Sequence, residues 1–184
     1  MPMWAIVLLV ILVLVVLFVI STYNGLVGAR NKVRDQFSQI DIQLKKRFDL
    51  IPNLVENVKG YAKHESETFE KVIQARNGYM NAKDDDAKMK ASKELSSGIS
   101  KIFALAESYP ELKANTNFVD LQNQLKDIED KISYARQFYN DSVLMYNNKI
   151  EMFPSNVVAG MFHFTKESFF EAEAQEKENV KVQF

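Results

Sequence analysis

The side chains that could carry out chemistry are few, and they are scattered along the chain. His64 is followed by Glu65 and Glu67, and on a helix His64 and Glu67 would share a face because they are three residues apart. Two ligands do not make a metal site, since a bound zinc ion needs at least three protein groups. We therefore interpret His64 as a surface histidine, and we predict that the chain has no metal site.

A serine–lysine pair is the nearest approach to a nucleophilic centre. Ser97 and Lys101 are four residues apart, which on a helix would bring the hydroxyl close to an amine that could act as its base. Such a serine also needs a strained turn and an oxyanion hole, and neither is indicated nearby. The spacing is what any polar helix face offers, so we predict no dyad. His163 stands among aromatic residues, and we interpret it as a packed core histidine.

The composition removes other kinds of chemistry. There is no cysteine, so disulfides, thiolate metal sites and thiol nucleophiles are excluded. With 23 Lys and Arg against 24 Asp and Glu, the net charge of −1 argues against a nucleic-acid partner. Gly25 and Gly28 are the closest pair of glycines, and neither belongs to a phosphate-binding loop. We predict no catalytic residue, no cofactor-binding residue and no small-molecule substrate, so the chain is not expected to be an enzyme.

The first element is an uninterrupted apolar run. Every residue from Met3 to Ile20 is apolar, and as a helix this segment would be roughly 27 Å long, close to the hydrocarbon thickness of a bilayer. A cleaved signal peptide fits badly, because no Lys or Arg precedes the run. We therefore predict an uncleaved anchor over residues 1–22. Arg30, Lys32 and Arg34 follow it, so the positive-inside rule places a short amino terminus outside and the rest in the cytoplasm.

The residues after the anchor have helical periodicity. Apolar side chains recur at steps of three, four or seven from Leu26 to Phe69, which predicts one amphipathic helix ending between Gly78 and Lys83. Pro52 either kinks this helix or divides it in two; the unbroken apolar phase favours a kink. The basic run from Lys45 to Arg47 is interpreted as a solvated helix face.

Two further helices are predicted. The first begins after Asp84 and ends before Pro110; the second begins at Asn115–Asn117 and ends at Phe153–Pro154. We expect the second to pack through its apolar stripe, above all through Leu121, Leu125, Ile128 and Ile132. The fold class is therefore all-α: a transmembrane helix that continues into an elongated antiparallel bundle of three to four long helices, with the bundle over residues 23–153.

The last segment, residues 154–184, is rich in aromatic side chains. We expect it to pack on the bundle or on a neighbouring subunit, or to lie at the membrane interface. The side chains expected to make these contacts are Phe162, Phe164, Phe169 and Phe170. Strand-like alternation occurs only at Val180–Phe184, which could add a strand to a partner.

Taken together, several strings resemble the LemA family, in order and over nearly the whole chain. They are Tyr23-Asn24-Gly25-Leu26-Val27, the run from Gln39 to Val55 (QIDIQLKKRFDLIPNLV), the run from Ala106 to Asn115 (AESYPELKAN), and Ala135-Arg136-Gln137-Phe138-Tyr139-Asn140. Phe37 stands where the family pattern leads us to expect a tryptophan, which preserves an aromatic core position.

This resemblance implies a bacterial inner-membrane protein with a single span, a long helical bundle and no established enzymatic activity, linked to membrane organisation. We expect a structural or scaffolding protein that has the lipid bilayer as a partner, forms homo-oligomers or recruits other membrane proteins. The alternative is an accessory subunit that regulates a membrane protease or transporter. The resemblance carries over no catalytic residue.

Overall fold

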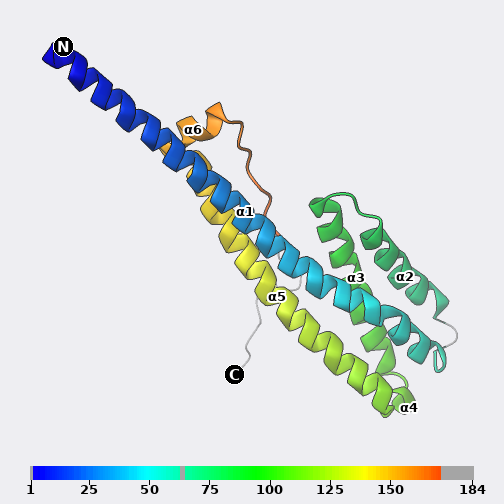
Figure 1. Cartoon of the computed structure of the whole chain (residues 1–184). Helices are drawn as coiled ribbons and strands as arrows, with labels where there is room; N and C mark the ends of the chain where they lie inside the picture. The colour runs from blue at the N-terminus through cyan, green and yellow to red at the C-terminus, as the bar shows by residue number, and fades with distance from the viewer. Residues whose placement is uncertain (1, 63–64, 171–184) are drawn as a thin grey trace, which may run out of the picture. The chain divides into compact units, whose positions relative to one another are not determined.

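The longest element is a single helix, α1 (Met3–Lys59), in the computed structural model, which describes residues 2–62 and 65–170 (Figure 1). The helix runs through Pro52 without a break, as the apolar phase indicated. It does not continue to Gly78, however, so that prediction is wrong. The backbone leaves the helix at Gly60, where the N–H groups of Tyr61 and Ala62 both donate to the carbonyl of Val58.

The end of α1 at Lys59 was not predicted because the apolar spacing continues beyond it. Ala62 lies beyond the helix and is still buried, and Phe69 is buried in the next helix, α2 (Ser66–Met80). Spacing alone therefore reads as one continuous face. Gly60, a poor helix former, marks the place where the helix ends.

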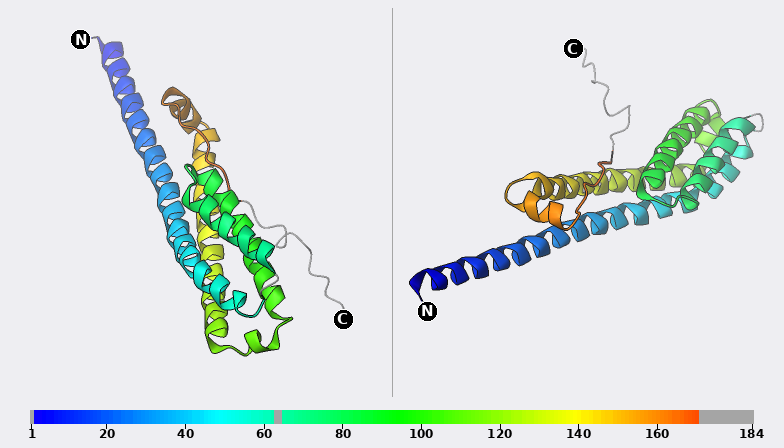
Figure 2. Two further views of the ribbon diagram at one scale, coloured as in Figure 1. Left: turned by 90° about the vertical axis from the view of Figure 1, so that its right-hand side faces the viewer. Right: turned by 90° about the horizontal axis from the view of Figure 1, so that it is seen from above.

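Helices α2 and α3 (Asp85–Ala106) lie side by side (Figures 1 and 2). The predicted start of α3 is confirmed: the Asp84 carboxylate accepts a hydrogen bond from the Ala87 N–H at 2.7 Å and caps the helix. Gly98 of α3 lies close against α2, since an added Cβ would lie 2.6 Å from Cγ2 of Val72. A side chain larger than hydrogen does not fit there without movement of α2 or α3 side chains.

A short helix, α4 (Pro110–Lys113), leads into α5 (Thr116–Glu151). The side chain of Asn115 accepts from the Phe118 N–H at 3.2 Å, so the predicted cap is confirmed. The predicted stripe is also buried, at Leu121, Leu125, Ile128 and Ile132. After a cis bond between Phe153 and Pro154 the chain forms α6 (Ser155–Met161).

The chain divides into two compact units. Among the described residues, the first unit consists of 2–38 and 136–169, and the second consists of 39–62, 65–135 and Phe170. All regular structure in this described part is helical, so the all-α prediction is confirmed. The strand expected at Val180–Phe184 lies outside the described residues.

Candidate functional site

The predicted absence of a metal site concerned His64, which lies outside the described residues. Its neighbour Glu67 is exposed on α2 and accepts a hydrogen bond from Lys71 Nζ at 2.6 Å. This bond and the positive charge of Lys71 hold the pKa of Glu67 below its usual value. In residues 2–62 and 65–170, no three His, Cys, Asp or Glu side chains gather closely enough to hold a metal ion.

Ser97 and Lys101 both lie on the exposed face of α3. They line an open groove of about 410 Å³ that also includes Lys71 and Glu94. Within the described part of the chain no hydrogen bond joins the Ser97 hydroxyl to the Lys101 amine.

His163 is exposed, and the prediction of a packed core histidine is therefore wrong. It follows α6 with a φ of 55°, in the left-handed region. This turn directs the two neighbouring rings, Phe162 and Phe164, to Tyr23 of α1, while the imidazole stays in solvent.

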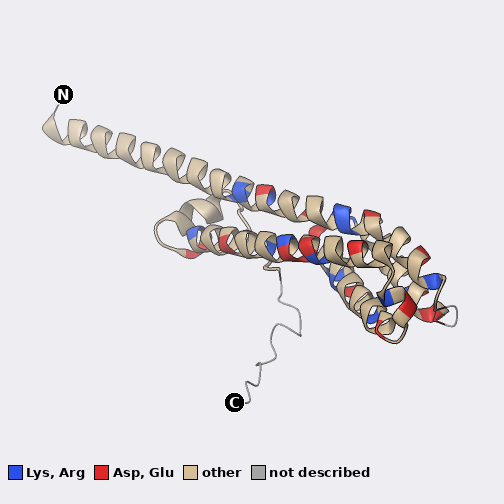
Figure 3. Ribbon diagram, turned by 90° about the horizontal axis from the view of Figure 1, so that it is seen from below, with Lys and Arg blue, Asp and Glu red and all other residues tan. Residues whose placement is uncertain are grey.

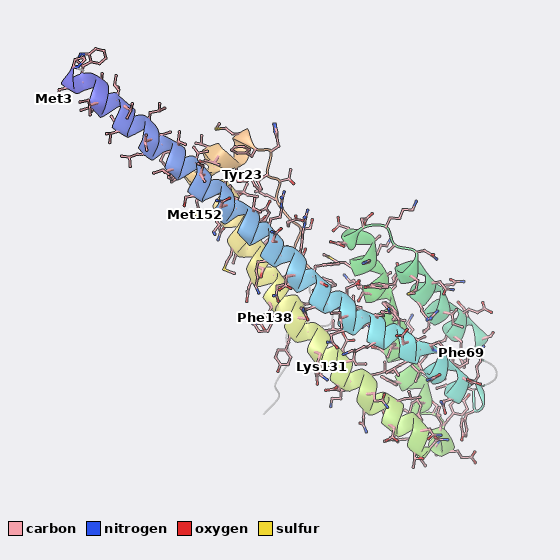
Figure 4. The ribbon with its side chains drawn as sticks, viewed as in Figure 1. Met3, Tyr23, Phe69, Lys131, Phe138 and Met152 are labelled. Carbon is pink, nitrogen blue, oxygen red and sulfur yellow. The ribbon has the colours of Figure 1, made fainter. Side chains whose placement is uncertain are left out.

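The apolar segment, Met3 to Ile20, is the most distinctive surface of the first unit. Its most apolar 18-residue window has a mean hydropathy of 3.5, and none of that window is buried. Side chains project from it on all sides in Figure 4, and no charged residue occurs there in Figure 3. By length and composition this part of α1 can cross a membrane.

An aromatic cluster directly follows the apolar segment. The ring of Tyr23 lies 4.7 Å from that of Phe162 and 5.7 Å from that of Phe164, between ring centroids. The guanidinium of Arg30 lies 5.1 Å from the centroid of Phe164, a cation–π arrangement. We call Tyr23, Arg30, Phe162 and Phe164 the collar.

Helix α6 is held against α1 by a small apolar core. Leu26, Val158 and Ala159 are buried together, and Val19, Ile150 and Phe164 pack against them. Val19 belongs to the apolar segment itself, so α6 reaches the last turn of that segment. Of the four tail phenylalanines expected to make contacts, Phe164 is half-buried and Phe170 is buried, whereas Phe162 and Phe169 are each 47% exposed.

The residues after α6 are fastened to α5 by hydrogen bonds. Asn147 donates to the carbonyl of Glu167 and accepts from its N–H, both at 3.0 Å. Tyr139 donates from its hydroxyl to the carbonyl of Ser168 at 2.9 Å. The extended stretch up to Phe169 therefore follows α5 closely, because side chains of α5 form hydrogen bonds with its backbone.

A buried arginine in the second unit was missed by the sequence interpretation. Lys45 and Lys46 are exposed as expected, but Arg47 is fully buried, so the prediction of a solvated face is wrong at this residue. Arg47 comes three residues after Leu44 and four before Ile51, and this spacing puts it on the apolar face of α1. That spacing is the signal by which it could have been found.

The guanidinium of Arg47 joins three helices. One nitrogen donates to Ser96 Oγ at 2.8 Å and to Glu129 at 2.5 Å. The other donates to Ser92 Oγ at 2.8 Å and to the Ser92 carbonyl at 3.1 Å. A buried guanidinium must be satisfied in this way, because removing its charge from water is costly. These hydrogen bonds therefore link α1 to α3 and α5.

A second polar cluster lies between α1, α2 and α3. One carboxylate oxygen of Asp41 accepts from the Tyr79 hydroxyl and from Lys88 Nζ, the latter at 2.9 Å. Burial raises the pKa of Asp41, but the bonds from Tyr79 and Lys88 and the positive charges of Lys88 and Lys45 lower it by more, so the pKa lies below its usual value. Burial and the same hydrogen bond raise the pKa of Tyr79.

These features define a class: an all-α protein with an exposed apolar helix and a helical part ordered by buried polar groups. The LemA family model matches residues 36–184, and the chain belongs to the LemA family. It is also similar to the protein LemA of Metamycoplasma hominis, with 27% identity over 161 residues that cover 85% of this chain and 72% of the relative. The resemblance inferred from the sequence is thereby confirmed. The family model begins after the apolar segment and the collar residues Tyr23 and Arg30.

Proposed function

We propose that this chain is a non-enzymatic structural or scaffolding protein, anchored by its amino-terminal helix in the bacterial inner membrane, where it self-assembles or recruits partners and contributes to membrane organisation. One observation carries the proposal: no part of the most apolar window of α1 is buried. Exposing so many large apolar side chains to water would be strongly unfavourable, and a bilayer removes that cost.

The charges around the anchor support one orientation. Arg30, Lys32 and Arg34 follow the apolar segment directly, so we place the carboxyl-terminal side in the cytoplasm. The collar agrees with an end of the span at this point, since a tyrosine ring close to an arginine is typical of the layer between lipid and water.

A face of α5 supports self-assembly. Phe138 and Met145 are 60% and 57% exposed, and their separation of seven residues is the heptad spacing of a coiled coil. Figure 4 shows Phe138 projecting away from α5. A second copy brings the same pair, and anchoring in one membrane confines the copies to a shared plane. We propose that copies meet through this face of α5.

The test is the oligomeric state of the full chain extracted with its lipids, measured by native mass spectrometry and by cross-linking in membranes. We expect a homo-oligomer that is lost in the double variant Phe138→Glu, Met145→Glu, because glutamates would oppose each other across the interface. The double variant Gln74→Glu, Asn77→Glu adds the same charge at exposed polar positions of another helix, α2, and should leave the oligomer intact.

Two other outcomes would overturn this proposal. A protein that stays monomeric at all concentrations, with no cross-linked species, would refute self-assembly. A second polypeptide at fixed stoichiometry without a homo-oligomer would favour the accessory regulatory subunit of a membrane protease or transporter.

A further inference from the structure

The chain around α6 exposes an apolar surface that no described part of the first unit covers. Its large side chains, which we call the α6 rim, are Met152 (64% exposed), Phe153 (81%), Val157 (55%), Met161 (63%) and Phe162 (47%). Between Glu151 and Lys166 the sequence contains no Asp, Glu, Lys or Arg. Large exposed apolar side chains gathered in one segment are typical of an interaction site.

The position of the rim along α1 follows from contacts on the opposite side of α6. Val158 and Ala159 pack with Leu26, and Val19 of the apolar segment packs against the same core. Lys149, at the end of α5, donates to the carbonyl of Gly25 at 3.5 Å. Figures 1 and 2 show α6 and the end of α5 beside this stretch of α1. The rim therefore lies at the level where the apolar segment ends.

We propose that the α6 rim inserts into the headgroup layer of the bilayer, on the side of the membrane that carries the helical domain. This inference rests on the proposed anchorage of α1. The occupant is lipid because an element that contacts Val19 is next to the membrane whenever the apolar segment spans it, and the rim side chains stay 47–81% exposed beside α1. The protein thus makes a second, interfacial contact with the membrane that holds its anchor.

The surroundings of the rim set its depth. Asn156 and His163 are exposed polar side chains that need water or headgroups, so they exclude immersion in hydrocarbon. Lys166, which pairs with Glu151, and Lys149 border the rim and would face the lipid phosphates. An interfacial helix with such a border lies about 5–10 Å into the boundary between headgroups and acyl chains.

The absence of cysteine in the chain makes a direct test simple. Single variants Val157→Cys and Met161→Cys, both at exposed positions, are labelled with the environment-sensitive dye NBD. The full-length proteins are then reconstituted in phosphatidylcholine–phosphatidylglycerol vesicles. Brominated acyl chains, with bromine either near the headgroup or near the chain end, serve as quenchers. Lys83→Cys, at an exposed position between α2 and α3, is the matched control.

We expect blue-shifted emission from both rim positions and a larger loss of emission with bromine near the headgroup than near the chain end. The label at position 83 should emit as in water and lose nothing. The single tryptophan, Trp4, lies in the apolar segment, and its own quenching reports whether that segment is in the bilayer.

The two proposals fail in different ways. Quenching of Trp4 with no quenching at positions 157 and 161 would overturn the interfacial contact and leave the anchor standing. Blue-shifted emission at those positions without lipid quenching would show that protein covers the rim, and would equally overturn the inference. Absence of Trp4 quenching would refute the anchorage itself.

Discussion

At the scale of single residues, the feature that distinguishes the charged side chains is whether they are buried. Lys45, Lys46 and Arg47 are adjacent in sequence, yet only Arg47 is enclosed by the second unit. Composition cannot distinguish the three, but position relative to Leu44 and Ile51 can. Ser92 and Ser96, four residues apart on α3, supply hydroxyls where an apolar stripe would otherwise continue. Arg47, Ser92 and Ser96 each interrupt an apolar stripe, so the sequence can indicate that they are buried. Only the fold shows that they contact one another.

Replacing Arg47 by alanine should destabilise the protein strongly. The variant leaves a cavity and removes the donors of four hydrogen bonds, a loss of about 3 kcal/mol or more. In a chain of this size this corresponds to a fall of roughly 6–12 °C in Tm, measured by circular dichroism in detergent. Lys46→Ala, at the exposed neighbouring position, should change stability by no more than about 0.5 kcal/mol. Equal effects of the two substitutions would contradict the role assigned to Arg47.

Asp41 should make stability dependent on acid. Its pKa in the folded protein is below the ordinary value of 3.8, so ionised Asp41 stabilises the fold above about pH 4, and this contribution disappears as the pH falls through the folded-state pKa. Asp41→Asn should therefore lower Tm at pH 7 but converge with the wild type once the pH falls below the folded-state pKa of Asp41. Thermal unfolding across this range measures the difference. Asp49→Asn, on the exposed face of the same helix, is the control; a constant gap between wild type and Asp41→Asn at every pH would be the contrary result.

At the scale of elements, local sequence was sufficient to predict a helix end wherever a capping side chain or a proline marks it. Asp84 and Asn115 begin helices with capping side chains, and Phe153–Pro154 follows the end of α5. The end of α1 has Gly60 but no proline or capping side chain, and buried Ala62 preserves the apolar spacing beyond the last helical turn. Helix boundaries could be predicted where a capping side chain or a proline marks them. They could not be predicted where the chain only turns.

The contact between α2 and α3 should be sensitive to one methyl group. In Gly98→Ala the new Cβ would lie 2.6 Å from Cγ2 of the fully buried Val72, too close for either side chain to remain in place. Overpacking of this kind costs about 1–3 kcal/mol, more than the roughly 1 kcal/mol that alanine gains over glycine in a helix. The protein should therefore lose stability in chemical denaturation despite the better helix former.

Substitution of Val72, the residue that contacts Gly98, provides a control for this prediction. In the background Val72→Ala the offending methyl is absent, so Gly98→Ala should there be neutral or stabilising. Additive effects of the two substitutions in a double-mutant cycle would mean that the close approach does not limit the packing.

At the scale of the whole molecule, the all-α class and the family followed from the sequence alone, because periodicity and ordered motifs extend over most of the chain. The packing of α6 on α1 did not follow, since it joins residues more than a hundred positions apart through Leu26, Val158 and Ala159. Likewise, the aromatic tail was expected to make contacts, but the turn at His163 decides which rings reach α1. Contacts between small apolar side chains that are far apart in the sequence cannot be predicted from the spacing of apolar residues within one helix.

The proposed topology predicts a simple labelling pattern. Single-cysteine variants Pro2→Cys and Lys83→Cys, expressed in bacterial cells with a permeable outer membrane, are treated with a maleimide that does not cross the inner membrane. Position 2 should react in these cells, and position 83 should react only after the inner membrane is opened, because the basic residues following the span keep that side inside. The reverse pattern would invert the orientation without removing the anchor.

Helical continuity between the apolar segment and the collar has a rotational consequence. No flexible linker separates Ile20 from Tyr23 or Leu26, so the azimuth of the segment about its own axis is coupled to that of α6. Each residue of an α-helix advances about 100° and 1.5 Å. A protein that binds one side of the span within the bilayer therefore also fixes the direction in which α6 and the neighbouring Lys149 and Lys166 face.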